Sequence, residues 1–206
     1  MKRITTLSFF MLLCWITAFA IPRAEYPRPQ FERNAWINLN GEWTYSFDFG
    51  GSGLEREWFK STGFDQKIIV PFCPESKLSG VEYKDFINHM WYHRTISIPQ
   101  DWANKQVLLN FGAVYYKSEI YIDGVFAARH FGGTSSFQAD ITPYVKAGQT
   151  HNLVVYVESD VRSTHQPSGK QNLQFASYGC NYTRTTGIWQ TVWRKLFIPK
   201  DYSLSR

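Results

Sequence analysis

The sequence contains little cysteine and only one long apolar run. Of its three cysteines, Cys14 lies inside that run, which leaves Cys73 and Cys180 for a mature chain. Two thiols form at most one disulfide, so a small fold held by several bridges is excluded. The sequence does not decide whether the two pair, and we expect free thiols. After residue 20 nothing approaches the ~20 apolar residues of a membrane-spanning helix, so no membrane partner is predicted.

The apolar run is predicted to be a secretory signal peptide. Lys2 and Arg3 precede the run LSFFMLLCWITAFA, which closes on Ala18-Phe19-Ala20. A basic start, a short apolar stretch and small residues at the end are typical of a cleaved leader. We expect cleavage after Ala20 and a secreted or periplasmic protein. Lipid attachment at Cys14 is disfavoured, because Leu13 is larger than the small residue that normally precedes a lipidated cysteine.

The net charge is also small, and the sequence lacks common metal-binding, phosphate-binding and nucleophile motifs. The formal net charge of +5 falls to +3 without the leader, with 20 basic residues against 17 acidic ones, which is too mild to indicate nucleic acid. His89 and His93 are the closest histidines, but on one strand they would lie about 13 Å apart, too far to chelate one metal. There is no phosphate-binding glycine loop, no nucleophile elbow and no Cys-x-x-Cys. We therefore predict no metal and no cofactor.

What the sequence does have is aromatic residues, at 17%, in short runs with β-branched residues between Gly, Pro, Asn and Asp. No stretch of eleven residues has a helical period, although Asp101 could cap one turn in DWANKQ. Asp123-Gly124 is typical of a type I′ hairpin turn. Some ten short strands predict an all-β fold of two packed layers. The expected strands include GEWTYSF, WYHRTISIP, VLLNF, SEIYI, VFAARH, LVVYV and GIWQTVWRKLFIP.

The chain is expected to be one domain with two special segments. Three prolines predict an extended arm over residues 21–34, followed by a domain over residues 35–200 and the start of a linker at 201–206. The longest connection runs from Ser159 to Tyr182 with little strand character. Long loops in compact domains are typically functional or disordered.

Seven motifs in order resemble the N-terminal sugar-binding domain of glycoside hydrolase family 2, which includes β-galactosidases, β-glucuronidases and β-mannosidases. They are YPRPQF, NLNGEWTYSFD, VPFCPESKLSG, WYHRTISIP, DITPYV, QPSGKQ and TTGIWQTVW. The resemblance covers residues 26–198 and implies a galactose-binding-domain-like jelly-roll β-sandwich. Family members continue into an immunoglobulin-like domain and a TIM barrel. These domains, and a β-glycoside carbohydrate, are the partners that the resemblance implies.

The resemblance places no catalytic residue in this chain. In the family the two catalytic glutamates lie in the barrel, and retaining hydrolysis needs two carboxyl groups about 5 Å apart. We expect a non-catalytic domain that supports the barrel and lends a loop to its sugar pocket, inactive by itself. An autonomous carbohydrate-binding module or lectin-like domain is the alternative, and an independent hydrolase is a third hypothesis.

The resemblance points to Asn181 as a sugar contact. β-Galactosidases and β-glucuronidases of the family present an aspartate six residues before a Gly-Ile pair, and counting back from Gly187 reaches Asn181. An amide can both accept and donate a hydrogen bond, but it lacks the charge, so the sugar preference stays open. The alternative is an Asx turn. Beside it, Tyr182 could stack on a sugar and Arg184 could bind hydroxyl groups, or both could pack against the barrel.

A second candidate is the pair Asn88 and His89, where family members also send a loop toward the pocket. For Trp189 and Trp193 we expect a structural role on one face of a single final strand, because residues i and i+4 of a strand share a face. Three polar residues of the long connection could line a domain interface or remain solvated: Asp160, Gln166 and Lys170.

Overall fold

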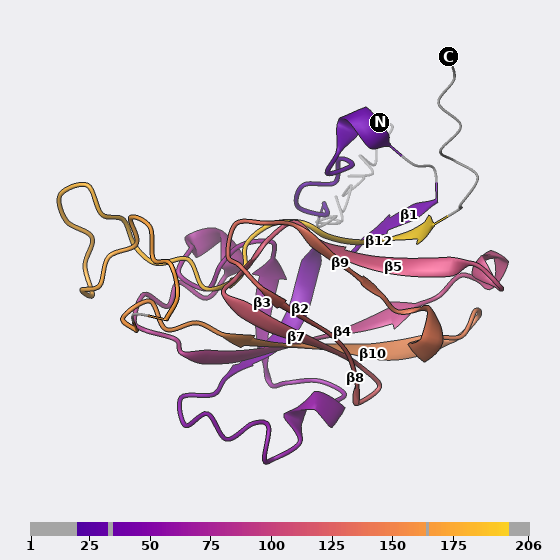
Figure 1. Ribbon diagram of the computed structural model, residues 1–206, viewed down its shortest axis with the longest axis horizontal. Coiled ribbons are helices and arrows are strands. Elements are labelled where there is room, and N and C mark those ends of the chain that lie inside the picture. The colour runs from indigo at the N-terminus through magenta and orange to yellow at the C-terminus, as the bar shows by residue number, and fades with distance from the viewer. Residues whose placement is uncertain (1–19, 33–34, 164, 198–206) are drawn as a thin grey trace, which may run out of the picture.

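The computed structural model describes residues 20–32, 35–163 and 165–197, and two antiparallel sheets face one another across a common core (Figure 1). The prediction of an all-β sandwich is confirmed. The predicted leader, apart from Ala20, lies outside the described residues, and so does the predicted linker start. Among the described residues there is no helix long and apolar enough to cross a membrane.

The larger sheet has six strands in the order β3-β2-β4-β10-β7-β8. Every neighbouring pair is antiparallel. The strands are β2 (Gly41–Phe47), β3 (Gln66–Val70), β4 (His89–Ser97), β7 (Lys117–Ile122), β8 (Val125–Phe131) and β10 (Thr150–Glu158).

The smaller sheet has four strands in the order β1-β12-β5-β9, and a separate two-stranded pair joins β11 to β6. Its strands are β1 (Trp36–Asn38), β5 (Gln106–Phe111), β9 (Phe137–Asp140) and β12 (Val192–Phe197), with β6 (Val114–Tyr115) and β11 (Gly187–Ile188) in the pair. The helical elements within the described residues are single 3₁₀ turns: η1 (Pro29–Phe31), η2 (Trp58–Lys60), η3 (Lys77–Ser79), η4 (Gln100–Trp102) and η5 (Thr142–Tyr144).

Alternating side chains of the strands build the core between the two sheets. In β2, Trp43 and Tyr45 are buried, and in β4 so are Tyr92 and Ile96. Successive residues of a strand point to opposite faces, so this alternation directs one set inward. Trp43 also donates its indole N–H to the Leu39 carbonyl at 2.7 Å, which satisfies its polar atom inside the core.

Residues of β4, β7 and β10 that point away from this core build a second apolar layer on the outer face of the six-stranded sheet. Trp91, Tyr121, Val154 and Tyr156 form this buried cluster. Residues 48–65 cross beneath the sheet and cover the cluster with Trp58, Phe59 and Phe64 (Figure 1). The cover is dry and aromatic, with Phe59 stacked on Tyr121 at 5.1 Å between ring centroids.

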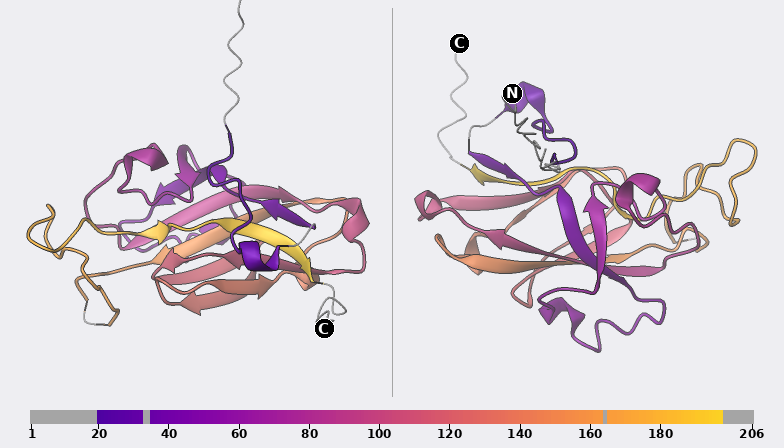
Figure 2. Two further views of the ribbon diagram at one scale, coloured as in Figure 1. Left: turned by 90° about the horizontal axis from the view of Figure 1, so that it is seen from above. Right: turned by 180° about the vertical axis from the view of Figure 1, so that it is seen from behind.

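The N-terminal arm lies over the outer face of the four-stranded sheet instead (Figure 2). The buried Asn40 amide donates to the Pro22 carbonyl at 2.9 Å, and Asn38 donates to the Arg23 carbonyl at 2.8 Å. The Tyr26 ring is buried and packs edge-on against Trp36. The arm is therefore docked on the sandwich, and it contains the 3₁₀ turn η1 where the prolines had predicted extended chain.

The hairpin predicted at Asp123-Gly124 is present between β7 and β8. Asp123 and Gly124 have φ values of +48° and +80°, as a type I′ turn requires. The Asp123 carboxylate accepts hydrogen bonds from the Asn152 N–H at 2.7 Å and from His151 at 2.6 Å. The turn is thus tied to the neighbouring strand β10 as well as to its own.

Two local predictions were wrong. The final strand is broken, because β11 ends at Ile188 and β12 begins at Val192, so Trp189 and Trp193 do not share one strand. Between them the Thr191 carbonyl accepts from the Gly112 N–H at 2.8 Å, and the Trp189 indole N–H donates to the Gly133 carbonyl at 2.7 Å. The turn near residue 101 is the single 3₁₀ turn η4, in which Asp101 lies inside the turn, Pro99 occupies the N-cap position and no side chain caps it.

Candidate functional site

The long connection between β10 and β11 folds out from one end of the sandwich as a large loop (Figures 1 and 2). Its outgoing and returning segments are joined by backbone hydrogen bonds. The Tyr182 N–H donates to the Lys170 carbonyl at 3.0 Å, and the Asn172 N–H donates to the Tyr182 carbonyl at 2.8 Å. These two bonds close the base of the loop and fix the position of residues 181–182.

Asn181 lies in a turn at this base with its side chain half-exposed. Its N–H donates to the Tyr178 carbonyl at 3.1 Å, while its amide group makes no hydrogen bond to another described residue. An Asx turn would need the side-chain oxygen to accept from the backbone two residues on, and no such bond is present. The amide therefore keeps a donor and an acceptor for a group outside the described residues.

Tyr182 is 53% exposed and lines a cavity of about 270 Å³ beside the loop. Tyr115 and Tyr116 line the same cavity, together with Gln171 and Gly133. The Tyr115 hydroxyl donates to the Pro167 carbonyl, which connects the cavity wall to the loop. Aromatic side chains with a few polar groups are typical of the lining of small-molecule sites, although Asn181 is not among the residues that line this cavity.

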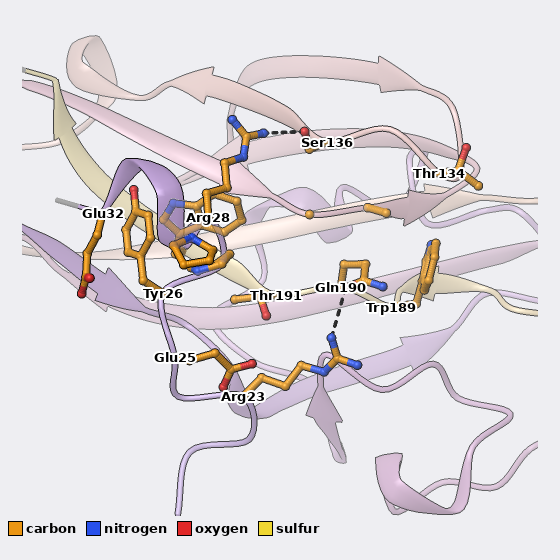
Figure 3. Close-up of a pocket in the computed structure, with 15 residues that line it drawn as sticks. Arg23, Glu25, Tyr26, Arg28, Glu32, Thr134, Ser136, Trp189, Gln190 and Thr191 are labelled. Atoms are coloured by element: carbon orange, nitrogen blue, oxygen red, sulfur yellow. Dashed lines mark hydrogen bonds between the residues drawn. The ribbon is translucent and has the colours of Figure 1, made fainter. Parts of the chain in front are cut away.

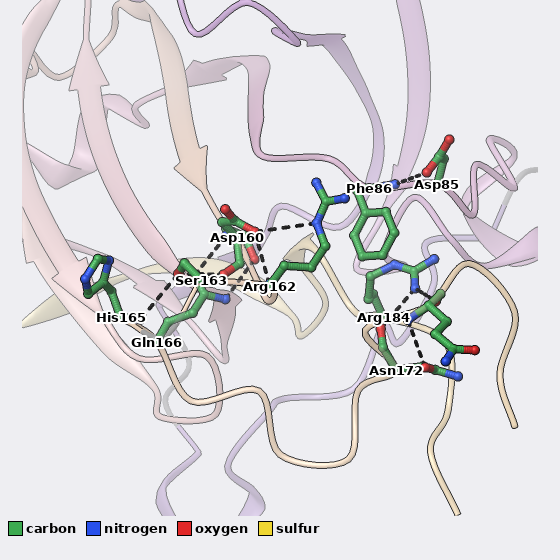
Figure 4. Close-up of polar contacts among 11 residues, drawn as sticks. Asp85, Phe86, Asp160, Arg162, Ser163, His165, Gln166, Asn172 and Arg184 are labelled. Carbon is green, nitrogen blue, oxygen red and sulfur yellow. Dashed lines mark hydrogen bonds and ion pairs between the residues drawn. The ribbon is translucent and has the colours of Figure 1, made fainter. Parts of the chain in front are cut away.

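Arg184 has a different environment (Figure 4). Its side chain is buried, and its two terminal nitrogens donate to four backbone carbonyls: Asn172 at 3.1 Å, Gln174 at 2.5 Å, Phe175 at 3.1 Å, and Lys84. Desolvation by burial lowers its pKa, but an arginine stays charged. The guanidinium therefore holds the loop tip to the body of the domain.

Phe86 completes this anchor from the sandwich side. Its ring lies 4.1 Å from the Arg184 guanidinium carbon and 3.9 Å from that of Arg162, so two cations from opposite ends of the loop contact one ring. Figure 4 shows Arg162 and Arg184 approaching Phe86 together. Arg184 is buried and Arg162 is exposed, and a cation–π contact at an exposed site contributes only about 0.5–1 kcal/mol.

The second candidate pair lies next to this loop. The Asn88 carbonyl accepts from the Ser159 N–H at 2.8 Å, at the point where the loop leaves β10. His89 contacts the Tyr156 hydroxyl at 2.8 Å through Nδ1 and stacks on the Tyr156 ring. The structure thus brings residues 84–89 and the loop together at one end of the sandwich, with His89 held by the sheet and Asn88 half-exposed.

The other loop residues that the sequence singled out act mainly through local contacts. The Gln166 side chain accepts from the Asp160 N–H at 2.9 Å and donates to the Ser159 hydroxyl at 3.3 Å. The Lys170 side chain is exposed, and its carbonyl is the acceptor for Tyr182. Asp160 and Gln166 therefore shape the start of the loop, as Figure 4 also shows.

A buried carboxyl under the loop was missed by sequence reasoning. Glu75 is 5% exposed, and its Oε2 accepts from the Thr186 N–H at 3.2 Å, where the loop returns to the core. Burial raises the pKa of Glu75 and raises that of the neighbouring Cys73 thiol to about 12. Cys73 and Cys180 are both free thiols. The only sequence signal for Glu75 was its place within the motif VPFCPESKLSG.

Metal-ligating side chains do not gather at this site. Across the described residues, 20–32, 35–163 and 165–197, no group of three or more His, Cys, Asp or Glu side chains could hold a metal ion. What the arrangement offers is a half-exposed amide, Asn181, and an exposed tyrosine ring, Tyr182, on an anchored loop. These groups can bind a hydroxylated ligand, but they supply no acid–base pair for chemistry.

Comparison with known proteins connects this geometry to a family. Residues 37–192 match the family model described as "Glycosyl hydrolases family 2, sugar binding domain". The chain is 30% identical to a β-glucuronidase of Felis catus over 135 residues, which are 60% of this chain and 20% of that protein. It is 26% identical to a β-galactosidase of Thermoanaerobacter pseudethanolicus over 78% of this chain and 20% of that protein.

The fold has solved relatives as well. The structure of Ruminococcus gnavus β-glucuronidase in complex with uronic isofagomine aligns with a TM-score of 0.64 and 19% identity, over 81% of this chain and 29% of that one. This likeness shows the fold. The chain spans about a fifth of the length of the curated relatives quoted above.

Proposed function

The chain belongs to the sugar-binding-domain family of glycosyl hydrolases family 2, and from this premise we propose that it is the non-catalytic N-terminal module of an exported glycosidase. In the full-length enzyme the module supports the catalytic domain and lends the loop of residues 159–186 to the sugar pocket. The substrate class is a β-glycoside. Immunoglobulin-like and barrel domains are the proposed partners.

The observation that carries this proposal is the contrast between the backbone of the loop, which is anchored, and its large apolar side chains, which are exposed. Arg184 is buried and bonded to four carbonyls, so the loop has a defined course. Yet the tip displays large apolar side chains to solvent: Leu173 is 53%, Phe175 59% and Tyr178 65% exposed. Exposed apolar groups gathered on one segment mark interaction sites, which fits a loop that packs against another domain.

Within that loop, Asn181 and Tyr182 are the proposed sugar contacts. The Asn181 amide makes no hydrogen bond within the described residues, and the Tyr182 ring is exposed beside a cavity. Arg184 is assigned a positioning role, because its terminal nitrogens are used by backbone carbonyls. Asn88 and His89 form the adjoining edge of the same end, where Asn88 is the half-exposed member.

The test is a fusion in which this chain replaces the matching segment of a related family 2 β-glucuronidase. We expect hydrolysis of a nitrophenyl β-glycoside by the fusion and none by the chain alone. Asn181→Ala and Tyr182→Ala should each raise KM about tenfold or more, because each removes a direct ligand contact. Gln138→Ala, an exposed amide on β9, is the matched control and should leave KM unchanged.

Three outcomes would contradict the proposal. Turnover by the purified chain alone would support an independent hydrolase. Calorimetric titration of the chain with galactosides, glucuronides and plant oligosaccharides gives the second outcome, since tight binding that is lost in Asn181→Ala and Tyr182→Ala would favour an autonomous module at this loop. A fusion that is folded by circular dichroism but indifferent to both substitutions would also contradict the assigned contacts.

A further inference from the structure

A second and larger cavity lies away from the loop tip, between the N-terminal arm and the broken segment before β12 (Figure 3). Its volume is about 750 Å³, within the range of pockets that bind small ligands. The arm forms one wall, residues 189–193 form the floor with Gly112, and the connection between β8 and β9 forms the far wall. We call this cavity the arm cleft.

The arm cleft is held in shape by hydrogen bonds between its separate segments. Asn38 and Asn40 fasten the arm at Pro22 and Arg23. Arg28 donates to the Ser136 hydroxyl at 2.6 Å across the cleft, and the Trp189 indole N–H donates to the Gly133 carbonyl at 2.7 Å. Figure 3 shows the Arg28 contact and the contact between Arg23 and Gln190, with Trp189 on the side of the cleft away from Arg28. The cleft is thus part of the fold and not a gap beside a loose segment.

The lining combines aromatic surface with polar groups of both signs. Trp189 is half-buried, and its bond to Gly133 leaves the ring fixed at the edge of the cleft. Two arginines and two glutamates balance in charge, and Thr134 and Gln190 add a hydroxyl and an amide. Balanced charge disfavours a strongly anionic polymer, whereas forked donors, carboxylates and indole rings suit vicinal hydroxyls and the apolar faces of sugar rings.

Trp193 gives independent support for a ligand in the cleft, because one of its polar groups lacks a hydrogen-bond partner. It lines the cleft and is only 2% exposed, and its indole N–H has no hydrogen-bond partner among the described residues. A buried donor without a partner costs about 1–3 kcal/mol. Arg28 lies over this ring, with 6.0 Å from its guanidinium carbon to the ring centroid. A ligand hydroxyl would give the indole N–H an acceptor once the Arg28 side chain, which lies over the ring, moves aside.

We propose that the arm cleft binds a short neutral oligosaccharide, at a site whose lining shares only Thr134 with the cavity beside the loop. Trp189 provides the stacking surface, and Arg28, Gln190 and Glu25 provide the hydroxyl contacts. This inference goes beyond the proposed function, since it requires neither a barrel nor the residues Asn181 and Tyr182. In the full-length enzyme such a cleft would hold a polymeric substrate away from the point of cleavage.

The experiment is calorimetric titration of the full chain with neutral oligosaccharides, namely galacto-, manno-, xylo- and cello-hexaoses, and with an uncharged hydrophilic peptide. We expect binding of at least one oligosaccharide series and not of the peptide. Trp189→Ala and Gln190→Ala should weaken that binding about tenfold or more, because they remove central contacts. Gln66→Ala, an exposed amide on β3 outside the lining of the cleft, is the matched control and should leave binding unchanged.

Each other result would overturn the proposal. Absence of binding at millimolar oligosaccharide, equal binding of the peptide, or binding that is lost in Tyr182→Ala but kept in Gln190→Ala would each do so. Gln190→Ala guards against misfolding, because it removes only a half-buried side chain and leaves the Trp189 bond to Gly133 in place. Near-ultraviolet circular dichroism of each variant checks the fold. An unchanged KM of the Asn181 and Tyr182 variants in the fusion assay would contradict the proposed function but would not affect the binding measured here. The two proposals can therefore fail separately.

Discussion

The two outer faces of the sandwich are covered in different ways. On the six-stranded sheet, residues 48–65 place Trp58, Phe59 and Phe64 directly on the cluster around Trp91, and the contact is apolar. On the four-stranded sheet, the arm places Arg28 and Tyr26 near Trp193 and leaves a polar cleft of about 750 Å³. The segment of residues 48–65 adds a second apolar core, whereas the arm leaves an open cleft, which is the proposed oligosaccharide site.

The two covering segments differ in how they are anchored and in whether their side chains are apolar or charged. The segment over Trp91 is tied down by the buried Asp48 carboxylate, which accepts from the N–H groups of Ser52 at 3.0 Å and Gly53 at 2.8 Å and from the Trp91 indole at 3.2 Å. The arm is tied down by the Asn38 and Asn40 amides at its first residues and by the bond from Arg28 to the Ser136 hydroxyl. Beyond Arg23 its charged side chains are exposed, so they cannot form a dry layer.

The largest expected effect comes from Trp91→Ala. The indole is 0% exposed under the aromatic cover, so its removal should lower the free energy of unfolding by about 3–5 kcal/mol. Trp189→Ala in the arm cleft is the matched comparison and should cost less than half as much, because Trp189 is only half-buried. Urea denaturation measures both. Equal costs would show that the two faces are covered equally well.

Asp48→Asn tests the anchor of the apolar cover. The amide keeps the size of the side chain, but its nitrogen cannot accept the two hydrogen bonds that Oδ2 receives, so we expect a loss of roughly 2–3 kcal/mol in unfolding free energy. Asp65→Asn, at an exposed position of the same segment, should change stability by less than about 0.5 kcal/mol. If both variants unfold at the same urea concentration, the anchor is not at Asp48.

Asn40→Ala tests the anchor of the arm. Its amide donates to the Pro22 carbonyl at 2.9 Å and accepts from the Val192 N–H at 3.0 Å, so removal should cost about 1–2 kcal/mol and release the arm. Limited proteolysis should then cut within residues 22–30 faster than in the unchanged chain, while residues 48–65 stay protected. An unchanged cleavage rate would mean that Asn40 does not hold the arm.

The smallest effect concerns the seam where the edges of the two sheets meet. His130 of β8 stacks on Phe137 of β9 at 4.1 Å, and burial lowers the pKa of its imidazole. Folding therefore favours the neutral ring, and this contribution is complete above the unfolded-state pKa of about 6.5 and declines as the pH falls below it.

His130→Phe should remove that acid dependence while keeping the ring contact. Thermal unfolding between pH 5 and pH 8 measures it, and we expect a flatter profile for the variant with a difference below about 1 kcal/mol at neutral pH. A profile as steep as that of the unchanged chain would assign the acid dependence to other groups. The contact between His130 and Phe137 would then not be the source of the pH dependence of stability.

Much of the sandwich could be predicted because its signals are local. Alternation in GEWTYSF and WYHRTISIP identified both faces of two strands, and Asp123-Gly124 identified a hairpin whose backbone angles confirm it. The break between Ile188 and Val192 could not be predicted, since it depends on Gly112 and Gly133, which are distant in the sequence. A tryptophan-rich run otherwise has every feature of one strand.

The candidate site was harder to predict for the same reason. Arg184 between polar residues could serve as a hydroxyl-binding fork, and only the fold shows that carbonyls from Lys84 and residues 172–175 converge on it. The arm cleft gave no signal either, because three prolines predict an extended segment but not where it docks. Residue types identified the chemistry that is available, and the tertiary contacts decide which groups stay exposed.

The Arg184 contacts have a consequence for how the module would join another domain. A 26-residue excursion such as residues 160–185 would ordinarily lose much conformational entropy when it becomes ordered at an interface. Here the guanidinium, the Phe86 ring and the paired backbone at Tyr182 have already removed most of that freedom in the single domain. Docking would therefore cost little additional ordering, and the exposed tip could contribute nearly all of its buried area to affinity.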